Sequence, residues 1–247
     1  MKKIKYYLLA TLVFVFANTF AQTTSAVNHF DKVIVSPHIE VTFVEGNDES
    51  VTVEKSTVDN KKIHIEVKDK TLRIYLEGAK EVTKNEKNSE NEYEGKQPLY
   101  KGTVVTAVVS YKTLHELSIR GEETQVCKSV LTGDKFRLTV YGESQVILNE
   151  VNLGKMQTVL YGESSLEIKS GTVKDQRYTA YGEGHINTLG INGNTGSITA
   201  YGEANFRLNV SDEIKITAFG DATLQYKGNP VINKGLHFGD MHVEKLD

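Results

Sequence analysis

Tyr141-Gly142-Glu143 recurs every 20 residues, as Tyr161-Gly162-Glu163, Tyr181-Gly182-Glu183 and Tyr201-Gly202-Glu203. Diverged copies flank these tripeptides, namely Arg120-Gly121-Glu122, Phe219-Gly220-Asp221 and Phe238-Gly239-Asp240. The central glycines of these seven copies are 21, 20, 20, 20, 18 and 19 residues apart. A fixed period of about 20 residues predicts a stacked array in which each structural unit contacts only its neighbours.

Apolar and polar residues alternate on both sides of each glycine, which is the pattern of a strand with one buried face. Two positions before the glycine, and four and six positions after it, the residues are mostly apolar, and we expect these columns to face the core. The columns one and three positions before the glycine should face outward. The first contains Tyr141, Tyr161, Tyr181, Tyr201, Phe219 and Phe238, and the second contains Ser118, Thr139, Val159, Thr179, Thr199 and Thr217.

A unit of this length with two or three short strands is typical of one coil of a parallel β-helix. A leucine-rich repeat would require a leucine and asparagine consensus, which this chain lacks, and a propeller blade would require about twice the period. The repeated glycine is expected at a bend that needs positive φ or a close backbone approach. The sequence therefore predicts an all-β solenoid of about 20-residue coils, with the Tyr-Gly-Glu repeats over residues 118–243.

The alternation already begins at Phe30, so one β-helix domain is expected over residues 30–247. Two apolar runs, 63–67 and 72–76, form either a hairpin or two adjacent sides of one coil. Residues 79–101 are dense in Lys, Glu and Asn, which predicts a charged, flexible excursion, with an interaction tail as the alternative. Residues 22–29 are expected to form a mature N-terminal tail.

The first 21 residues have the features of a signal peptide. Three lysines precede an apolar run of 12 residues, and Thr19-Phe20-Ala21 provides a small-x-small cleavage site. The run is too short to span a bilayer, and no later segment reaches that length. We therefore expect an exported protein of the periplasm, the cell surface or the medium without a membrane span after cleavage; an uncleaved anchor is the alternative.

The net charge and the cysteine content of the chain limit its expected partners and its covalent chemistry. A net charge of −3 provides no basic face, so nucleic acid is not an expected partner. Cys127 is the single cysteine, which excludes an intramolecular disulfide. It has no identifiable histidine partner, so we expect a small core residue rather than a nucleophile.

Several segments together resemble a known family. They are the exported N-terminus, the strands Phe30-Asp31-Lys32-Val33-Ile34-Val35, Glu40-Val41-Thr42-Phe43 and Thr71-Leu72-Arg73-Ile74, and the glycine-centred repeats. Over roughly residues 30–245 the chain resembles the “putative auto-transporter adhesin, head GIN domain” family of Bacteroidetes-type bacteria. The repeated turn in that family is usually Gly-Ser-Gly-like, whereas here it is Tyr-Gly-Glu. The resemblance implies a single-stranded right-handed parallel β-helix in the cell envelope or on the surface, and it supplies no catalytic motif.

The outward aromatic and threonine columns are the candidate binding residues. Stacked strands lie about 4.8 Å apart, so the rings should form a continuous stripe beside a threonine stripe. Such ladders stabilise neighbouring strands, and this purely structural role is one interpretation. The other is that the stripe binds sugar rings or an envelope protein. A third is that the rings pack against residues 79–101. The binding hypothesis rests on Tyr141, Tyr161, Tyr181, Tyr201, Phe219, Thr179 and Thr199.

Each repeat also places a carboxylate directly after its glycine. At about 4.8 Å, like charges repel by roughly 0.9 kcal/mol even in water, so the row should splay into solvent or gather cations. Weak calcium binding is therefore a hypothesis, and no other cofactor is expected. Its ligands would be Glu143, Glu163, Glu183, Glu203 and Asp221.

Catalysis is not the expected activity. Parallel β-helices include polysaccharide-acting enzymes that use clustered carboxylates with a basic residue. Here the carboxylates are evenly repeated, and nucleophile, zinc-protease and phosphate-loop motifs are absent. We therefore predict a non-enzymatic, adhesin-like binding protein of the bacterial cell envelope that uses the repeated Thr/Tyr/Glu face. A polysaccharide-acting enzyme and a purely structural envelope protein are the alternatives.

Overall fold

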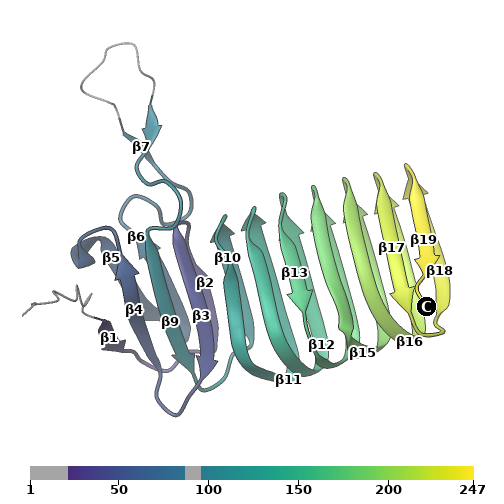
Figure 1. Ribbon diagram of the computed structural model, residues 1–247, viewed down its shortest axis with the longest axis horizontal. Helices are drawn as coiled ribbons and strands as arrows, with labels where there is room; N and C mark the ends of the chain where they lie inside the picture. The colour runs from purple at the N-terminus through teal and green to yellow at the C-terminus, as the bar shows by residue number, and fades with distance from the viewer. Residues whose placement is uncertain (1–21, 87–95) are drawn as a thin grey trace, which may run out of the picture.

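The computed structural model describes residues 22–86 and 96–247, which are mostly strand (Figure 1). The signal peptide predicted for residues 1–21 lies outside the described residues, as do residues 87–95 of the charged segment. The N-terminal strands are β1 (Thr23–Ala26), β2 (Lys32–Val35), β3 (Ile39–Glu45), β4 (Ser50–Ser56), β5 (Ile63–Lys68), β6 (Thr71–Leu76), β7 (Asn85–Glu86), β8 (Gln97–Pro98) and β9 (Val105–Tyr111). A 3-10 turn, Asn60–Lys62, precedes β5.

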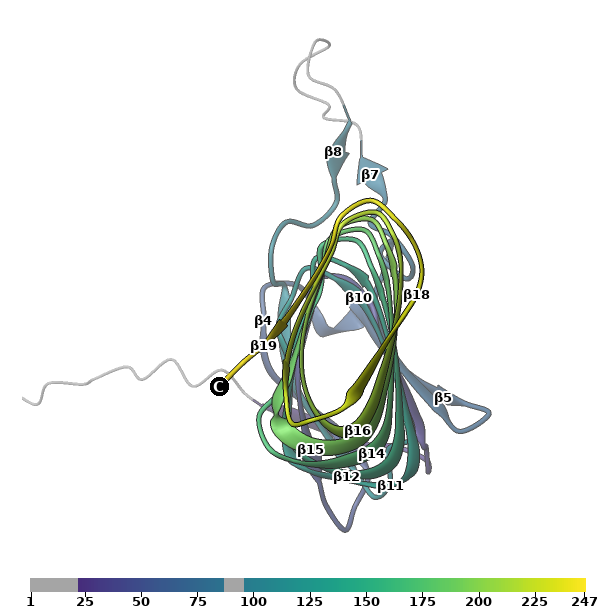
Figure 2. The ribbon, with the colours of Figure 1, turned by 90° about the vertical axis from the view of Figure 1, so that its right-hand side faces the viewer.

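The repeats form a parallel β-solenoid whose coils stack along the long axis of the molecule (Figure 1). Viewed from the C-terminal end, the coils superimpose as flattened loops (Figure 2). Their strands are β10 (Glu116–Gly121), β11 (Gln125–Gly142), β12 (Gln145–Tyr161), β13 (Ser165–Ile168), β14 (Gly171–Tyr181), β15 (Gly184–Tyr201), β16 (Ala204–Phe219), β17 (Ala222–Lys227), β18 (Val231–Phe238) and β19 (Met241–Lys245). The predicted fold class is confirmed.

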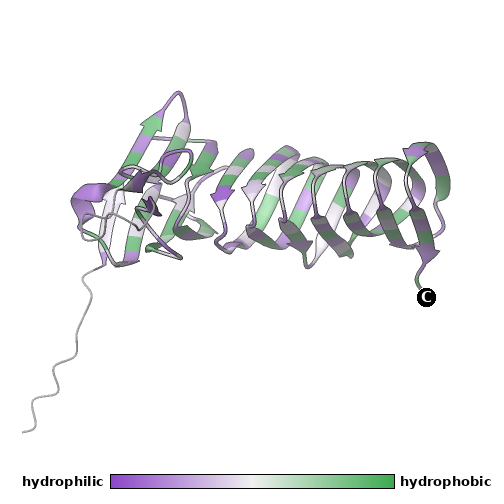
Figure 3. Ribbon diagram, turned by 90° about the horizontal axis from the view of Figure 1, so that it is seen from above, coloured by the Kyte–Doolittle hydropathy of each residue, from purple (hydrophilic) through white to green (hydrophobic). Residues whose placement is uncertain are grey.

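The coils are in register with the sequence period. Tyr141 pairs with Tyr161, and Tyr181 pairs with Tyr201, so equivalent residues of successive repeats lie directly above one another. The alternating apolar and polar bands along each strand are visible in Figure 3. The three apolar columns predicted for the core are buried, except that Tyr226 and Val243 in the last coils are only partly buried.

The repeated glycine has the backbone that was predicted for it. Gly162 has φ of +92° and Gly182 has φ of +105°, values that L residues rarely adopt. A Cβ atom on Gly162 would lie 2.5 Å from the carbonyl oxygen of Gly142 in the preceding coil. Both constraints therefore restrict this position to glycine, because the turns of successive coils are in direct contact.

The N-terminal half departs from a single parallel winding. Residues 63–76 form an antiparallel hairpin of β5 and β6, which decides between the two arrangements left open by the sequence. Its turn residues Asp69 and Lys70 both have positive φ, as a tight two-residue hairpin turn requires. β4 also runs antiparallel to β9. Beyond the hairpin, β6, β2 and β10 pair in parallel and continue the sheet of the solenoid.

The expected N-terminal tail over residues 22–29 needs correction. Thr23–Ala26 form strand β1, which pairs antiparallel with β4 from Thr23↔Val53 to Ala26↔Ser50. Val27 packs against the core, and its backbone N–H bonds to the carbonyl of Glu49. The backbone hydrogen bonds to the edge of β4 hold these residues in place, and β1 thereby covers an edge that would otherwise be unpaired.

The charged segment 79–101 is anchored at both ends. Ala79 is fully buried, and Tyr100 is nearly so, with its hydroxyl donating to the backbone carbonyl of Glu77. Leu99 packs against the core, and β7 pairs antiparallel with β8 above the coils of the solenoid (Figure 2). The segment therefore leaves and re-enters the body at fixed points, which brings residues 81–83 against the first repeats.

Candidate functional site

The outward aromatic column forms a stack of parallel rings, which we call the aromatic ladder: Tyr141, Tyr161, Tyr181, Tyr201, Phe219 and Phe238. From Tyr141 to Tyr201 successive ring centroids are 4.8, 4.9 and 4.8 Å apart, with interplanar angles of 2°, 4° and 2°. The stack continues to Phe219 at 5.1 Å and to Phe238 at 5.9 Å. The strand register imposes this spacing, because each ring occupies the same position of its coil.

The stacking decides which part of each tyrosine a ligand can touch. Face-to-face neighbours cover both faces of Tyr161, Tyr181 and Tyr201, yet 36–40% of each residue remains exposed. That exposure must therefore belong largely to the ring edges and the hydroxyl groups. This arrangement leaves no free tyrosine face between Tyr161 and Tyr201 on which a sugar ring could lie flat. The ladder instead presents a line of phenolic hydroxyls.

The threonine column lies beside the ladder, two residues earlier in each strand. Thr139 pairs with Val159, Val159 with Thr179, and Thr179 with Thr199, so the column is also in register. All are partly exposed, as predicted for an outward position. Residues two apart on a strand are about 6.6 Å apart along the backbone, so the two columns run side by side and form a lattice of hydroxyl groups that is interrupted at Val159.

Arg120 closes the N-terminal end of the aromatic ladder. Its guanidinium carbon lies 5.2 Å from the ring centroid of Tyr141. Glu81, from the base of the charged segment, forms an ion pair with Arg120 at 2.9 Å and accepts a hydrogen bond from Arg73 at 2.6 Å. A segment distant in sequence thus orients the cation that covers the first ring.

The carboxylates that follow the glycines lie on the surface. Glu143, Glu163, Glu183, Glu203 and Asp221 are all exposed, and Asp221 Oδ1 accepts a hydrogen bond from the backbone N–H of Asp240. Among residues 22–86 and 96–247 no group of three or more His, Cys, Asp or Glu side chains converges on a point where a metal ion could sit. Calcium binding by the row stays a prediction.

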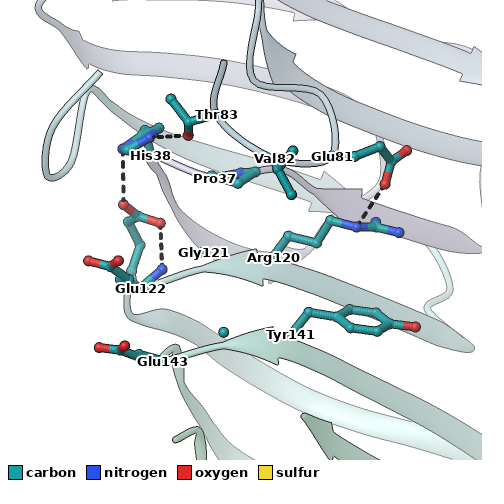
Figure 4. A pocket seen from close by; sticks show the side chains of 12 residues that line it. Pro37, His38, Glu81, Val82, Thr83, Arg120, Gly121, Glu122, Tyr141 and Glu143 are labelled. Atoms are coloured by element: carbon teal, nitrogen blue, oxygen red, sulfur yellow. Dashed lines mark hydrogen bonds and ion pairs between the residues drawn. The ribbon is translucent and has the colours of Figure 1, made fainter. Parts of the chain in front are cut away.

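A cavity of about 500 Å³ opens where the charged segment meets the first repeats (Figure 4). Pro37 and His38 come from the turn after β2, Val82 and Thr83 from the base of the charged segment, and the remaining lining residues are Glu81, Arg120, Gly121, Glu122, Glu123, Tyr141, Gly142 and Glu143. The sequence alone does not reveal this cavity, because only its repeat residues belong to a periodic pattern. The one feature of the sequence that could have indicated the cavity is Glu123, an acidic residue that does not recur in the later repeats.

Glu123 and His38 join the walls of the cavity. Their side chains lie 3.9 Å apart, and the His38 ring also contacts Thr83 Oγ1 at 2.7 Å and the Gly102 carbonyl at 2.8 Å. Burial raises the pKa of Glu123, although the backbone N–H of Glu122 and the His38 ring oppose this shift. Through its contacts with Glu123 and Thr83, His38 connects the base of the charged segment to the solenoid.

Sequence comparison identifies the family of this chain. The family described as “Putative auto-transporter adhesin, head GIN domain” matches residues 29–230. The chain belongs to this family. No curated relative matches it.

Solved structures share the fold of this GIN domain. A putative adhesin from Bacteroides fragilis NCTC 9343 has a TM-score of 0.76 at 17% identity, covering 93% of this chain and 98% of its own. A putative adhesin from Parabacteroides merdae ATCC 43184 has a TM-score of 0.66 at 16% identity, covering 92% and 96%. A putative lipid binding protein from Parabacteroides distasonis ATCC 8503 has a TM-score of 0.64 at 16% identity, covering 92% and 96%. At these identities the likeness shows the fold alone.

Within residues 22–86 and 96–247 of this GIN domain, no apolar helix of membrane-crossing length occurs. Cys127 is buried, as predicted, and lies 3.4 Å from the Tyr111 hydroxyl. Desolvation is the largest influence on this thiol and raises the pKa of Cys127 to about 11. It is therefore a core residue of the GIN domain rather than an activated nucleophile.

Proposed function

We propose that this protein is an exported, non-enzymatic binding protein of the cell envelope that recognises a glycan through its repeated Thr/Tyr/Glu face. The observation that supports this best is the in-register lattice of tyrosine and threonine hydroxyls along the solenoid. The N-terminal segment and the adhesin family support export. Neither the family nor the neighbouring structures name a ligand for this chain.

A lattice of hydroxyls suits a saccharide chain better than it suits an apolar ligand. Each hydroxyl can donate and accept a hydrogen bond, which matches the hydroxyls of sugars. A repeated ligand can engage several coils at once, so individually weak contacts add up through their effective concentration. The exposed carboxylates alongside supply further acceptors, and they would bind calcium weakly if the row gathers cations.

The experiment is a glycan-array screen of the chain from Gln22 onward, with and without calcium. The first variant replaces Tyr161, Tyr181 and Tyr201 with Phe, which keeps the stacked rings and removes only the hydroxyls. Phe219 already occupies this column, so the replacement fits the fold. The second variant replaces Thr179 and Thr199 with Val, the residue that Val159 places in the same column.

The proposal predicts specific glycan binding that falls at least tenfold in both variants, a loss of about 1.4 kcal/mol, with unchanged thermal unfolding. A well-folded wild-type protein that binds no glycan would overturn it, as would full binding by the two variants together. Loss of affinity in calcium-free buffer would add the carboxylate row to the site.

A further inference from the structure

The cavity beside Arg120 differs from the rest of the Thr/Tyr/Glu face because it is concave and is not built from repeats alone (Figure 4). Its volume of about 500 Å³ lies within the ~300–1,000 Å³ typical of small-molecule sites. One wall is the turn at Pro37, another is the base of the charged segment, and the floor is the glycine backbone of the first two repeats. The cavity therefore accepts one small group rather than an extended chain.

Its apolar surface is exposed to solvent. Val82 is 75% exposed, although a valine is usually placed in the core. Pro37 lies beside it in the cavity lining, and Tyr141 contributes the ring that begins the aromatic ladder. An apolar edge of a ligand would gain hydrophobic contacts here that solvent does not provide.

Two of the carboxylates that line the cavity have no counterion in the described part of the chain. Glu81 is bound by Arg73 and Arg120, and Glu123 faces His38. Glu122 and Glu143 remain, and within residues 22–86 and 96–247 neither carboxylate forms an ion pair. The two follow adjacent glycine turns that are joined by a hydrogen bond of 2.9 Å from the Glu143 N–H to the Gly121 carbonyl. A cation placed between these carboxylates would relieve their mutual repulsion.

We propose that this cavity binds an amino sugar, with its ammonium group between Glu122 and Glu143 and its apolar ring face against Val82 and Pro37. The identification of the ligand as a sugar rests on the proposed glycan-binding function. The cavity also contains Tyr141, so a saccharide chain that leaves the cavity can continue along the hydroxyl lattice. The cavity would thus bind one positively charged sugar residue of a glycan, while the hydroxyl lattice binds the neutral sugar residues that follow.

The test compares three ligands by calorimetry with the chain from Gln22 onward. A glucosamine oligomer carries the charge and the sugar, an N-acetylglucosamine oligomer of equal length lacks the charge, and a lysine-containing peptide lacks the sugar. The cavity variant is Glu122→Gln with Glu143→Gln. The matched control is Glu163→Gln with Glu183→Gln, which removes the same charge from the same column outside the cavity. All four positions are exposed, so both variants should fold.

The glucosamine oligomer should bind the cavity variant about tenfold more weakly than the wild type, because two charge contacts are lost together. The control should lose clearly less affinity, because its carboxylates supply only further acceptors along the face. The glucosamine oligomer should also bind the wild type at least about tenfold more tightly than its N-acetylated counterpart does, because only the free amine is charged. Equal loss in the cavity variant and the control would overturn the proposal, since the whole row would then attract cations without selection. Equal binding of both oligomers, or stronger binding of the peptide, would overturn it as well.

These outcomes are separable from those of the glycan-array screen. If neutral glycans bind the hydroxyl lattice while Glu122→Gln with Glu143→Gln changes nothing, only the amino-sugar inference fails. If the glucosamine oligomer is captured by the cavity while the tyrosine and threonine variants bind glycans normally, the lattice proposal fails and the cavity stands.

Discussion

The guanidinium of Arg120 lies over the ring of Tyr141, 5.2 Å from its centroid, and occupies the place that a further ring would take in the aromatic ladder. A cation at this position interacts with the negative face of the terminal ring, which has no aromatic neighbour on that side. Glu81 orients the guanidinium through its ion pair with Arg120. The ladder therefore ends in a polar contact instead of an exposed ring face.

The contact predicts a measurable coupling between the two residues. A double-mutant cycle of Arg120→Met and Tyr141→Leu should give a coupling free energy of about 0.5–1 kcal/mol in urea unfolding. The control cycle pairs Arg120→Met with Tyr181→Leu, two coils away, and should give a coupling near zero. Equal coupling in both cycles would mean that the ladder responds as a whole and that the cation contact has no separate effect.

The glycine turns predict a large difference between two substitutions that look alike. Gly162 and Gly102 both have positive φ, but a Cβ on Gly102 would meet nothing within 4 Å, whereas on Gly162 it would contact Gly142. Gly102→Ala should cost about 1–2 kcal/mol from the backbone conformation alone. Gly162→Ala should cost about 3 kcal/mol or more, because steric overlap with the neighbouring coil is added. Unfolding free energies in urea measure both, and equal costs would show that the coils can separate locally.

The period of the repeats was sufficient to predict the solenoid and its columns. One residue type per position, repeated at a fixed interval, determines both the direction of each side chain and its neighbours in adjacent coils. Tyr161 and Thr179 were therefore placed outside correctly. The orientation of the rings was not predictable in the same way, because a column of exposed aromatics is compatible with stacked or splayed rings until the backbone spacing and twist are known.

Two further features, the cavity and the antiparallel pairing of β1, could not be predicted from the sequence for a different reason. Thr23–Ala26 contain no apolar alternation, and their pairing depends on the free edge of β4. In the cavity, Pro37, Val82 and Glu122 come from three segments that share no period. Such a site depends on long-range contacts, which local patterns do not encode, and only the irregular Glu123 beside Glu122 marked its position.

Glu123 predicts a specific pH dependence of stability. Burial raises the pKa of this carboxyl in the folded state, and backbone hydrogen bonds together with the His38 ring offset only part of that shift. The unfolded state therefore ionises first as the pH rises. The stabilising contribution of Glu123 is complete below the ordinary carboxyl pKa and is lost as the pH rises through the raised value.

The variant Glu123→Gln should remove this dependence. Measured by urea unfolding at a series of pH values, the wild type should lose stability relative to the variant as the pH rises from about 4.3, the ordinary glutamate pKa, toward neutrality. A constant difference between the two proteins across this range would contradict the raised pKa.

The thiol of Cys127 should react only after the protein unfolds. With a pKa of about 11, about one thiol in 10⁴ is ionised at pH 7, and the side chain is also buried. Ellman's reagent should therefore modify the native chain negligibly over an hour and one thiol per chain in guanidinium. Cys127→Ser would place a hydroxyl in the same site beside Tyr111, at a cost of about 1–2 kcal/mol. Rapid modification of the native protein would instead require that the coil bearing β11 opens locally, and hydrogen exchange of the Cys127 amide would then be fast as well.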